Sequence, residues 1–304
     1  MDILQSFLSL IPVTLAQSLM LSFVVLAIMI PFRMLSFPDL TSEGAFPLGG
    51  AVCAVCLAAG VPAPVALVAA AAAGFAAGCC TAFIHLRFRI HTLLAGILMM
   101  TMLYSLNLRI MGRSNLSVYG MSSVFDGVPF TEAGSHYAKI AVVGLLVLLV
   151  FFLLIAFFRT EKGTAFRAVG ANADMAEAQG INVWAATIAG VGLAGAAAGF
   201  GGGLITQSQG FADVSMGIGV LINGLAALMI GEAIIGKQTL VRQLLAPFIG
   251  AIVYYQLVSL CLAAGMPPPD LKLSTGLFVL AMLAIPNLRR GRSGRMPAET
   301  VRER

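Results

Sequence analysis

Charged residues are scarce in this chain of 304 residues. Asp, Glu, Lys and Arg make up 10% of it, hydrophobic residues make up 59%, and the mean hydropathy is +0.96. A soluble domain has about 25% charged residues, because its surface must stay hydrated. The shortage therefore excludes a soluble enzyme, a disordered chain and a nucleic-acid-binding protein. It predicts an integral membrane protein surrounded by membrane lipid.

Residue patterns for catalysis and for cofactors are also missing. All five cysteines lie in apolar stretches, and the pair Cys53-x-x-Cys56 has no second pair or histidine near it, so we interpret them as small buried side chains. The three histidines have no partner at a metal-ligand spacing, and no Ser/His/Asp arrangement occurs. Gly201-Gly202-Gly203 lacks the Lys-Ser/Thr ending of a phosphate-binding loop. We predict no enzyme activity and no cofactor or metal bound by this chain.

Long apolar runs are what the sequence does contain. A helix needs about 20 apolar residues to cross a bilayer. The runs predict an all-α polytopic membrane protein with about nine transmembrane helices (roughly 8–10), because the shorter runs can be broken or re-entrant. The long candidates are Phe7–Ile30, Pro64–Ile84, Ala138–Phe158, Val183–Ile205, Met216–Ile235 and Leu244–Ala264, and the weaker ones are Phe46–Ala59, Leu93–Ile110 and Leu273–Ile285.

The basic residues predict how the chain lies in the membrane, because cytoplasmic loops are enriched in Lys and Arg. If the C-terminus is cytoplasmic, nine spans place 14 of the 18 basic residues on the inner side, and the opposite orientation reverses this bias. The longest outer loop is then Met111–Tyr137. We treat residues 1–304 as one transmembrane domain with a first half (1–158), a polar inner segment (159–182), a second half (183–288) and a basic cytoplasmic tail (289–304).

A short internal match relates the two halves. Phe37–Thr41 and Phe211–Ser215 both read aromatic, any residue, Asp, aliphatic, hydroxyl. The two copies start spans of opposite direction, as in the inverted repeats of many transporters. Asp before Thr or Ser is typical of a helix start. Two interpretations stay open for Asp39 and Asp213: plain caps at the membrane surface, or helix starts inside the membrane that face the translocation path.

Polar residues inside the spans are candidates for a solute pathway. They are costly in lipid unless they line a path or join two helices, and a contact between helices is the open alternative for each. Thr101, Tyr104 and Ser105 share one face of their predicted helix. Gln207 and Ser208 precede the second repeat element, and Glu232 lies near its inner end. The candidate pathway residues are Asp39, Thr41, Tyr104, Asn107, Asp213 and Asn223.

The polar inner segment carries the most specific pattern in the chain. It reads Gly163-Thr-Ala-Phe-Arg-Ala-Val-Gly-Ala-Asn172 and ends at Gly180-Ile181. We expect a short helix, a break near Gly170 and Asn172, and a second helical turn, with Phe166, Ala168 and Val169 facing a partner. The pattern resembles the coupling-helix region of ABC importer permeases of the branched-chain amino acid and ribose type. Phe37–Gly49 and Leu93–Gly112 also resemble that family, particularly a branch linked to aromatic amino acid uptake, and the resemblance covers about residues 5–290.

This resemblance implies a set of partners. They are a cytoplasmic ABC ATPase dimer that uses the ATP, a second permease subunit (an identical copy in the simplest case), and a periplasmic or lipid-anchored solute-binding protein. It also implies the bacterial cytoplasmic (inner) membrane as the location. The polar inner segment would then sit in a groove of the ATPase. The candidate coupling residues are Gly163, Phe166, Arg167, Ala168, Val169, Gly170, Asn172, Ala176 and Gly180.

Three functions are compatible with these observations. The leading hypothesis is a permease subunit of an ATP-driven ABC importer for a small polar solute, with an amino acid as the first choice. An ABC permease for a sugar or nucleobase uses the same polar groups. An ion-coupled secondary transporter explains the repeat and the acids inside the membrane, but leaves the polar inner segment unexplained.

Overall fold

The computed structural model describes residues 3–126, 136–267, 273, 276 and 277 of this chain. They are almost wholly helical, and eight segments are long and apolar enough to cross a membrane, which confirms the prediction of an all-α polytopic membrane protein. The ninth candidate, Leu273–Ile285, lies almost entirely outside the described residues. The helices are α1 (Ile3–Met29), α2 (Thr41–Ala58), α3 (Ala63–Phe88), α4 (Thr92–Met111), α5 (His136–Arg159), α6 (Glu161–Ala171), α7 (Ala173–Ala178), α8 (Val183–Gln209), α9 (Val220–Ile235) and α10 (Leu240–Ala263).

Short irregular elements interrupt the predicted spans at two places. A π-helix, η1 (Ile30–Met34), continues α1. The expected span Met216–Ile235 is split into a 3₁₀-helix, η2 (Val214–Gly217), and α9, because Gly219 takes a left-handed conformation (φ +83°) that favours glycine. Strand β2 (Phe211–Asp213) precedes η2 and pairs antiparallel with β1 (Asn115–Ser117), so Asn115 lies opposite Asp213.

Helix α8 forms the centre of the bundle, because its glycines allow other helices to approach closely. A Cβ on Gly195 would overlap the backbone of Gly74 in α3, and a Cβ on Gly202 would overlap the carbonyl oxygen of Phe46 in α2. Small residues at helix contacts are the usual means of packing in membranes, where lipid leaves little hydrophobic drive between helices. Capping fixes the two ends of α8: Asn182 accepts the N–H of Ala185 at 3.0 Å, and Gly210 ends the helix at φ +81°.

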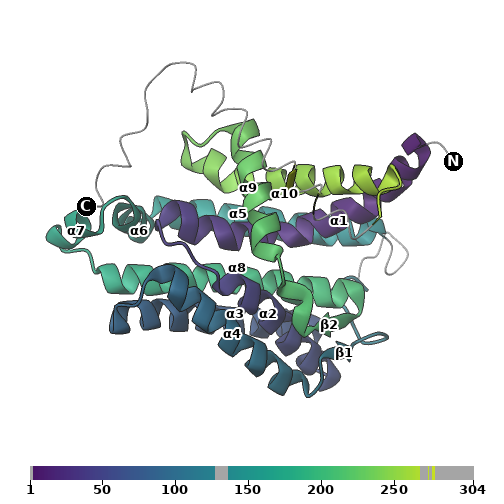
Figure 1. Cartoon of the computed structure of the whole chain (residues 1–304), viewed down its shortest axis with the longest axis horizontal. Helices are drawn as coiled ribbons and strands as arrows, with labels where there is room; N and C mark the ends of the chain where they lie inside the picture. Colours follow the sequence, from purple (N-terminus) through teal and green to yellow (C-terminus); the bar gives the residue numbers. More distant parts are fainter. Residues whose placement is uncertain (1–2, 127–135, 268–272, 274–275, 278–304) are drawn as a thin grey trace.

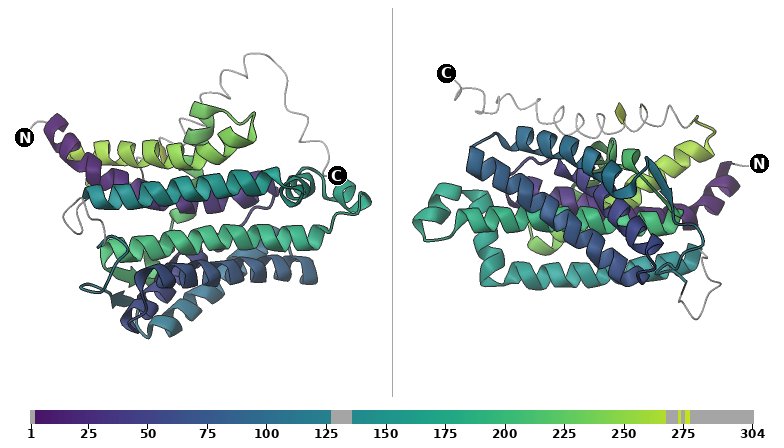
Figure 2. Two further views of the ribbon diagram at one scale, coloured as in Figure 1. Left: turned by 180° about the vertical axis from the view of Figure 1, so that it is seen from behind. Right: turned by 90° about the horizontal axis from the view of Figure 1, so that it is seen from below.

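The helices α6 and α7 lie at one end of the bundle, and the strands β1 and β2 lie at the opposite end (Figure 1). We call these the α6 end and the strand end. Helix α9 crosses the bundle obliquely on one face, whereas α5 lies on the opposite face (Figure 2). In the most apolar 18-residue stretch of α5, only 17% is buried in this chain, against 78% in the corresponding stretch of α1 and η1 together. Helix α5 therefore presents most of its surface to the surroundings.

The two copies of the internal match begin different structures. Asp39 leads directly into an 18-residue helix, whereas Asp213 ends a strand and leads into a short 3₁₀-helix. The inverted repeat therefore stays a prediction for the chain as a whole.

Candidate solute site and coupling segment

Asp39 and Asp213 make the same local hydrogen bonds. Oδ1 of Asp39 accepts the backbone N–H of Thr41 at 2.9 Å and the Thr41 hydroxyl at 2.5 Å. Oδ1 of Asp213 accepts the N–H of Ser215 at 2.7 Å and also its hydroxyl. Asp213 is the N-cap residue of η2, whereas Asp39 lies one residue before Leu40, the N-cap residue of α2, and accepts the N–H of the first helical residue. Their role in a solute pathway stays a prediction.

The surroundings of these two carboxyl groups differ. Asp39 is 2% exposed, and its partner Thr41 shares a hydrogen bond of 2.8 Å with Thr81 of α3. Burial raises the pKa of the Asp39 carboxyl from its ordinary value of 3.8, more than the bonds from Thr41 lower it. Hydrogen bonds from Ser215 lower the pKa of Asp213, which lies at the strand end and also accepts from Asn115 at 3.1 Å.

These shifts have opposite effects on stability. The raised pKa of Asp39 means that the folded state loses stability as pH rises above about 4. An Asn side chain keeps an oxygen for the two hydrogen bonds from Thr41 and carries no charge. We therefore expect Asp39→Asn to raise the Tm near neutral pH, and the gain in Tm to shrink toward about pH 4. The lowered pKa of Asp213 stabilises the fold above about pH 4, so the control Asp213→Asn should lower the Tm near neutral pH. Thermal unfolding across pH checks both, and a lower Tm for Asp39→Asn near neutral pH would contradict the first.

Helix α4 carries its polar residues on two sides. Tyr104 is 54% exposed, and Thr101 and Ser105 are exposed with it, so the face that the sequence predicts points away from the helices of this chain. Asn107 is 1% exposed and points inward, where its Nδ2 donates to the carbonyl of Gly44 at 3.4 Å and its Oδ1 has no partner among the described residues. The sequence left open whether these residues line a path or join helices.

The other predicted polar residues lie elsewhere in the bundle. Asn223 of α9 accepts the hydroxyl of Tyr254 in α10 at 3.0 Å, which is a contact between helices. Gln207 of α8 accepts the N–H of Val124 at 3.0 Å and donates to the carbonyl of Ala63 at 3.1 Å. The six candidate pathway residues are thus spread over several contacts rather than gathered in one place.

Glu43 is a candidate that the sequence reasoning missed. It lies in the first turn of α2, half-buried, and its Oε1 accepts the N–H of Gly219 at 3.1 Å, where α9 begins. The predicted span started at Phe46, which placed Glu43 outside the membrane. The helix instead starts at Thr41 and carries Glu43 inside the span. Pro47 in the same helix has no N–H to donate to the carbonyl of Glu43, so that oxygen lacks its helical partner.

The η2 segment packs on this part of α2. A Cβ on Gly217 would overlap the carbonyl oxygen of Glu43, and a Cβ on Gly50 would overlap the side chain of Met216. We call Glu43, Gly217 and Gly219 the Glu43 junction. It lies where α2, α4 and η2 meet, because Asn107 of α4 donates to the neighbouring Gly44.

A second polar region lies at the strand end, between α1, α5 and α8. It is a cavity of about 300 Å³, and Lys139 on its wall donates to the carbonyl of Ser208 at 3.0 Å. None of the six candidate pathway residues lines it. The polar residues that do are Gln17, His136, Lys139, Ser208 and Gln209.

The predicted coupling segment forms two short helices with a cap before each. Thr160 accepts the N–H of Gly163 at 3.3 Å before α6, and Asn172 accepts the N–H of Met175 at 3.0 Å before α7. The break falls at Asn172, and α6 continues through Gly170.

The expectation that Phe166 and Val169 face a partner is wrong. They are 2% and 6% exposed, and the Phe166 ring lies 5.7 Å from the ring of Phe158 in α5. Their apolar face is buried on this chain's own helices, which hold the segment in place. Gly163 packs on α5, Gly170 packs on η1, and Ala176 is buried. Of the candidate coupling residues, Arg167, Asn172 and Gly180 are exposed, and Ala168 is half-buried.

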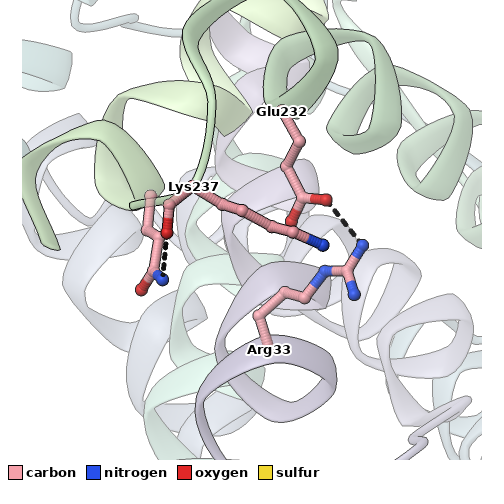
Figure 3. Close-up of polar contacts among 4 residues, drawn as sticks. Arg33, Glu232 and Lys237 are labelled. Atoms are coloured by element: carbon pink, nitrogen blue, oxygen red, sulfur yellow. Dashed lines mark hydrogen bonds and ion pairs between the residues drawn. The ribbon is translucent and has the colours of Figure 1, made fainter. Parts of the chain in front are cut away.

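An ion pair joins η1 to α9 near the α6 end. Nη2 of Arg33 lies 2.6 Å from Oε2 of Glu232, whose side chain is 11% exposed against 39% for Arg33 (Figure 3). It is the one salt bridge within the part of the chain that the structure describes. Figure 3 also shows the side chain of Lys237 extending toward this pair. The pair links residues 199 positions apart, which no local sequence pattern indicates.

The segment after η1 contacts the coupling segment. The hydroxyl of Ser36 donates to the carbonyl of Gly170 at 3.0 Å, and Ser36 holds a left-handed conformation (φ +50°) that is uncommon for a residue other than glycine. A Cβ on Gly170 would overlap the carbonyl oxygen of Met34. Residues 33–36 therefore contact α6 on one side and α9 on the other.

Comparison with known proteins identifies the family. A family model described as "Branched-chain amino acid transport system / permease component" matches residues 11–286. The chain belongs to this family of ABC transporter permeases. It is 35% identical over 272 residues to the tyrosine transport system permease protein of Clostridioides difficile (strain R20291), and the match covers 90% of each chain. It is 32% identical over 274 residues to the uncharacterized protein RP368 of Rickettsia prowazekii (strain Madrid E), covering 89% of this chain and 95% of that one.

No solved structure matches this permease at a significant level. Membership of the family means that the chain is not an enzyme, because the ATPase is a separate subunit. Permeases of this family work with an ATPase and a solute-binding protein. The eight candidate spans agree with a multi-pass membrane protein.

Proposed function

We propose that this permease is a subunit of an ATP-driven importer for amino acids, with tyrosine and other aromatic amino acids as the first candidates. The observation that carries the proposal is the 35% identity to a tyrosine transport system permease over 90% of both chains. The docked α6 and α7 give further support. An ion-coupled secondary transporter has no use for such a segment, and no observation favours a sugar or a nucleobase.

The proposed assembly contains two copies of this permease, an ATPase dimer and a solute-binding protein, in the bacterial inner membrane with the C-terminus in the cytoplasm. ATP is bound and used by the ATPase. The α6 end is the cytoplasmic end, since Arg33, Arg167 and Lys237 come from segments that gather there, as the positive-inside rule expects. The outer loop with β1 lies at the other end, where the solute-binding protein docks.

The proposed mechanism follows a line of contacts through the permease. Movement of the ATPase shifts α6, which contacts residues 34–36 through Gly170, and Arg33 then transmits the shift to α9 through Glu232. The far end of α9 contacts α2 at the Glu43 junction. A shift of α9 against α2 therefore changes the junction, and ATP drives a shift between two populated states.

A transport assay tests the function. The permease is purified with its ATPase, reconstituted in liposomes with the solute-binding protein, and supplied with labelled tyrosine. We expect accumulation that needs ATP and that unlabelled phenylalanine reduces, while ribose and adenine do not. Uptake driven by an ion gradient without ATP, or competition by ribose or adenine alone, would overturn the proposal.

The exposed surface of α6 and α7 is where the ATPase is proposed to bind. Arg167 is exposed there and makes no ion pair among the described residues, so its charge is available to a partner. We expect Arg167→Glu to lower ATPase recovery on co-purification by about tenfold or more, because a reversed charge at an interface repels its partner. The control Arg87→Glu reverses an exposed charge at the end of α3 and should retain the ATPase. Equal recovery from both variants would show that Arg167 lies outside the interface.

A further inference from the structure

We propose that Glu43 receives the ammonium group of the amino acid as it crosses the permease. This inference rests on the proposed function, since it assumes an amino acid solute. It adds a specificity-determining residue, Glu43, which recognises a cationic group of the solute at the Glu43 junction.

The charges within the spans single out Glu43. The described spans contain two acidic residues, Glu43 and Glu232. Glu232 is paired with Arg33, whereas Glu43 has no basic residue within ion-pair distance among the described residues. A charged residue within a span is costly, and it usually marks a substrate or ion path when no structural partner neutralises it.

The other carboxylates near this region are already engaged. Asp39 and Asp213 each bind the N–H and the hydroxyl of the residue two positions later. The side chain of Glu43 accepts one hydrogen bond from the described residues, through Oε1 from Gly219. Its Oε2 is left to accept from a ligand. A single carboxylate oxygen of this kind can accept a hydrogen bond from an ammonium group.

The surface around the Glu43 junction fits a path for an aromatic amino acid. Asn107 donates to Gly44, the residue next to Glu43, and its buried Oδ1 has no partner within the described part of the chain. Ser215 of η2 and Ile218, the residue before Gly219, are exposed. Polar groups and a large apolar side chain thus lie next to Glu43 and Gly219. A zwitterion with a ring needs both kinds of contact.

Two substitutions separate recognition from a purely structural role. Glu43→Gln keeps an oxygen for the N–H of Gly219 and loses the charge. Glu43→Asp keeps the charge but is one methylene shorter, so it cannot hold the 3.1 Å bond without backbone movement. If Glu43 binds the ammonium group, ATP-driven tyrosine uptake falls about tenfold or more in Glu43→Gln and less in Glu43→Asp. If Glu43 only holds the N–H of Gly219, uptake falls more in Glu43→Asp than in Glu43→Gln, and that order would overturn the proposal.

A measurement on the complex without substitutions covers the case in which a variant does not assemble. A hydrophobic carbodiimide adds to the protonated fraction of a carboxyl group in a membrane span, taking up the acid proton, and peptide mass spectrometry locates the adduct. We expect modification of Glu43 rather than of the paired Glu232, and slower modification while tyrosine is being transported. Modification of Glu43 at a rate that tyrosine transport does not change would overturn the proposal. If the unmodified complex fails to transport tyrosine with ATP, the proposed function fails instead.

Discussion

Replacing Gly170 with alanine is expected to abolish most ATP-driven uptake, by about tenfold or more, while the permease stays folded in the membrane. The Cβ of alanine would overlap the carbonyl oxygen of Met34, so α6 or η1 must move. The same movement disturbs the bond from Ser36 to the Gly170 carbonyl. These contacts connect the coupling segment to the rest of the permease, whereas the spans pack through α8 and do not depend on them.

The same substitution at another helical glycine supplies the control for this prediction. A Cβ on Gly144 of α5 would meet nothing within 4 Å, so Gly144→Ala adds the same methyl group without a collision. Uptake by this variant should stay close to that of the permease without substitutions. ATPase co-purification is measured for both variants. If Gly170→Ala transports as well as Gly144→Ala, the contact between α6 and η1 has no role in coupling.

The sequence predicted the helices well because their signals are local. The predicted apolar runs fall on the helices, because an apolar run is a property of neighbouring residues. The helix ends at Asn172, Asn182 and Gly210 are likewise fixed by groups close in sequence. The match between Asp39 and Asp213 is also local, and both carboxylates accept the N–H of the residue two positions later. The predicted span began at Phe46 because the residues before it are polar, although the Asp39–Thr41 pattern already indicated a helix start. The helix does begin at Thr41, where Thr41 and Ser42 are buried.

Which side chains are buried within the chain and which are exposed was predicted less well, because this depends on packing between distant segments. Phe166 and Val169 form an apolar face that a partner or this chain could bury, and the sequence does not say which. Burial on α5, α8 and η1 decides it. Helix α4 raises the same difficulty, since its exposed and buried polar residues are only three positions apart at Tyr104 and Asn107. The Glu43 junction joins residues 176 positions apart, so it needed the tertiary structure.

Helix α9 is held by a charged side chain at each end. Glu43 binds the N–H of Gly219 at its start, and Arg33 binds Glu232 near its finish. Between them α9 crosses the bundle obliquely (Figure 1). The middle of α9 packs closely on α10, where a Cβ on Gly231 would overlap the carbonyl oxygen of Ala246, so we expect these two helices to move together. The polar contacts at the two ends of α9 can be exchanged between states, because hydrogen bonds and ion pairs re-form with new partners or water. This makes α9 the element whose position we expect to differ between inward-facing and outward-facing states.

Charge reversal of the ion pair tests whether α9 is driven from the α6 end. Glu232→Arg places two positive side chains together in a partly buried position, and we expect uptake to fall about tenfold or more. Arg33→Glu should have a similar effect. The double variant Arg33→Glu/Glu232→Arg restores opposite charges, so it should recover part of the lost uptake. Coupling energies of contacting pairs span about 0.5–3 kcal/mol. We expect a value near the lower limit, because the Arg33 side chain is 39% exposed.

The double-mutant cycle gives the decisive comparison, since each single variant alone can fail for reasons of folding. Tm, ATPase co-purification and tyrosine uptake are measured for all four proteins. Recovery of uptake in the double variant, with the ATPase bound in every case, places the pair between the coupling segment and the transport step. Additive losses of uptake would show that Arg33 and Glu232 act independently, and α9 would then have to receive its movement through α10, against which it also packs.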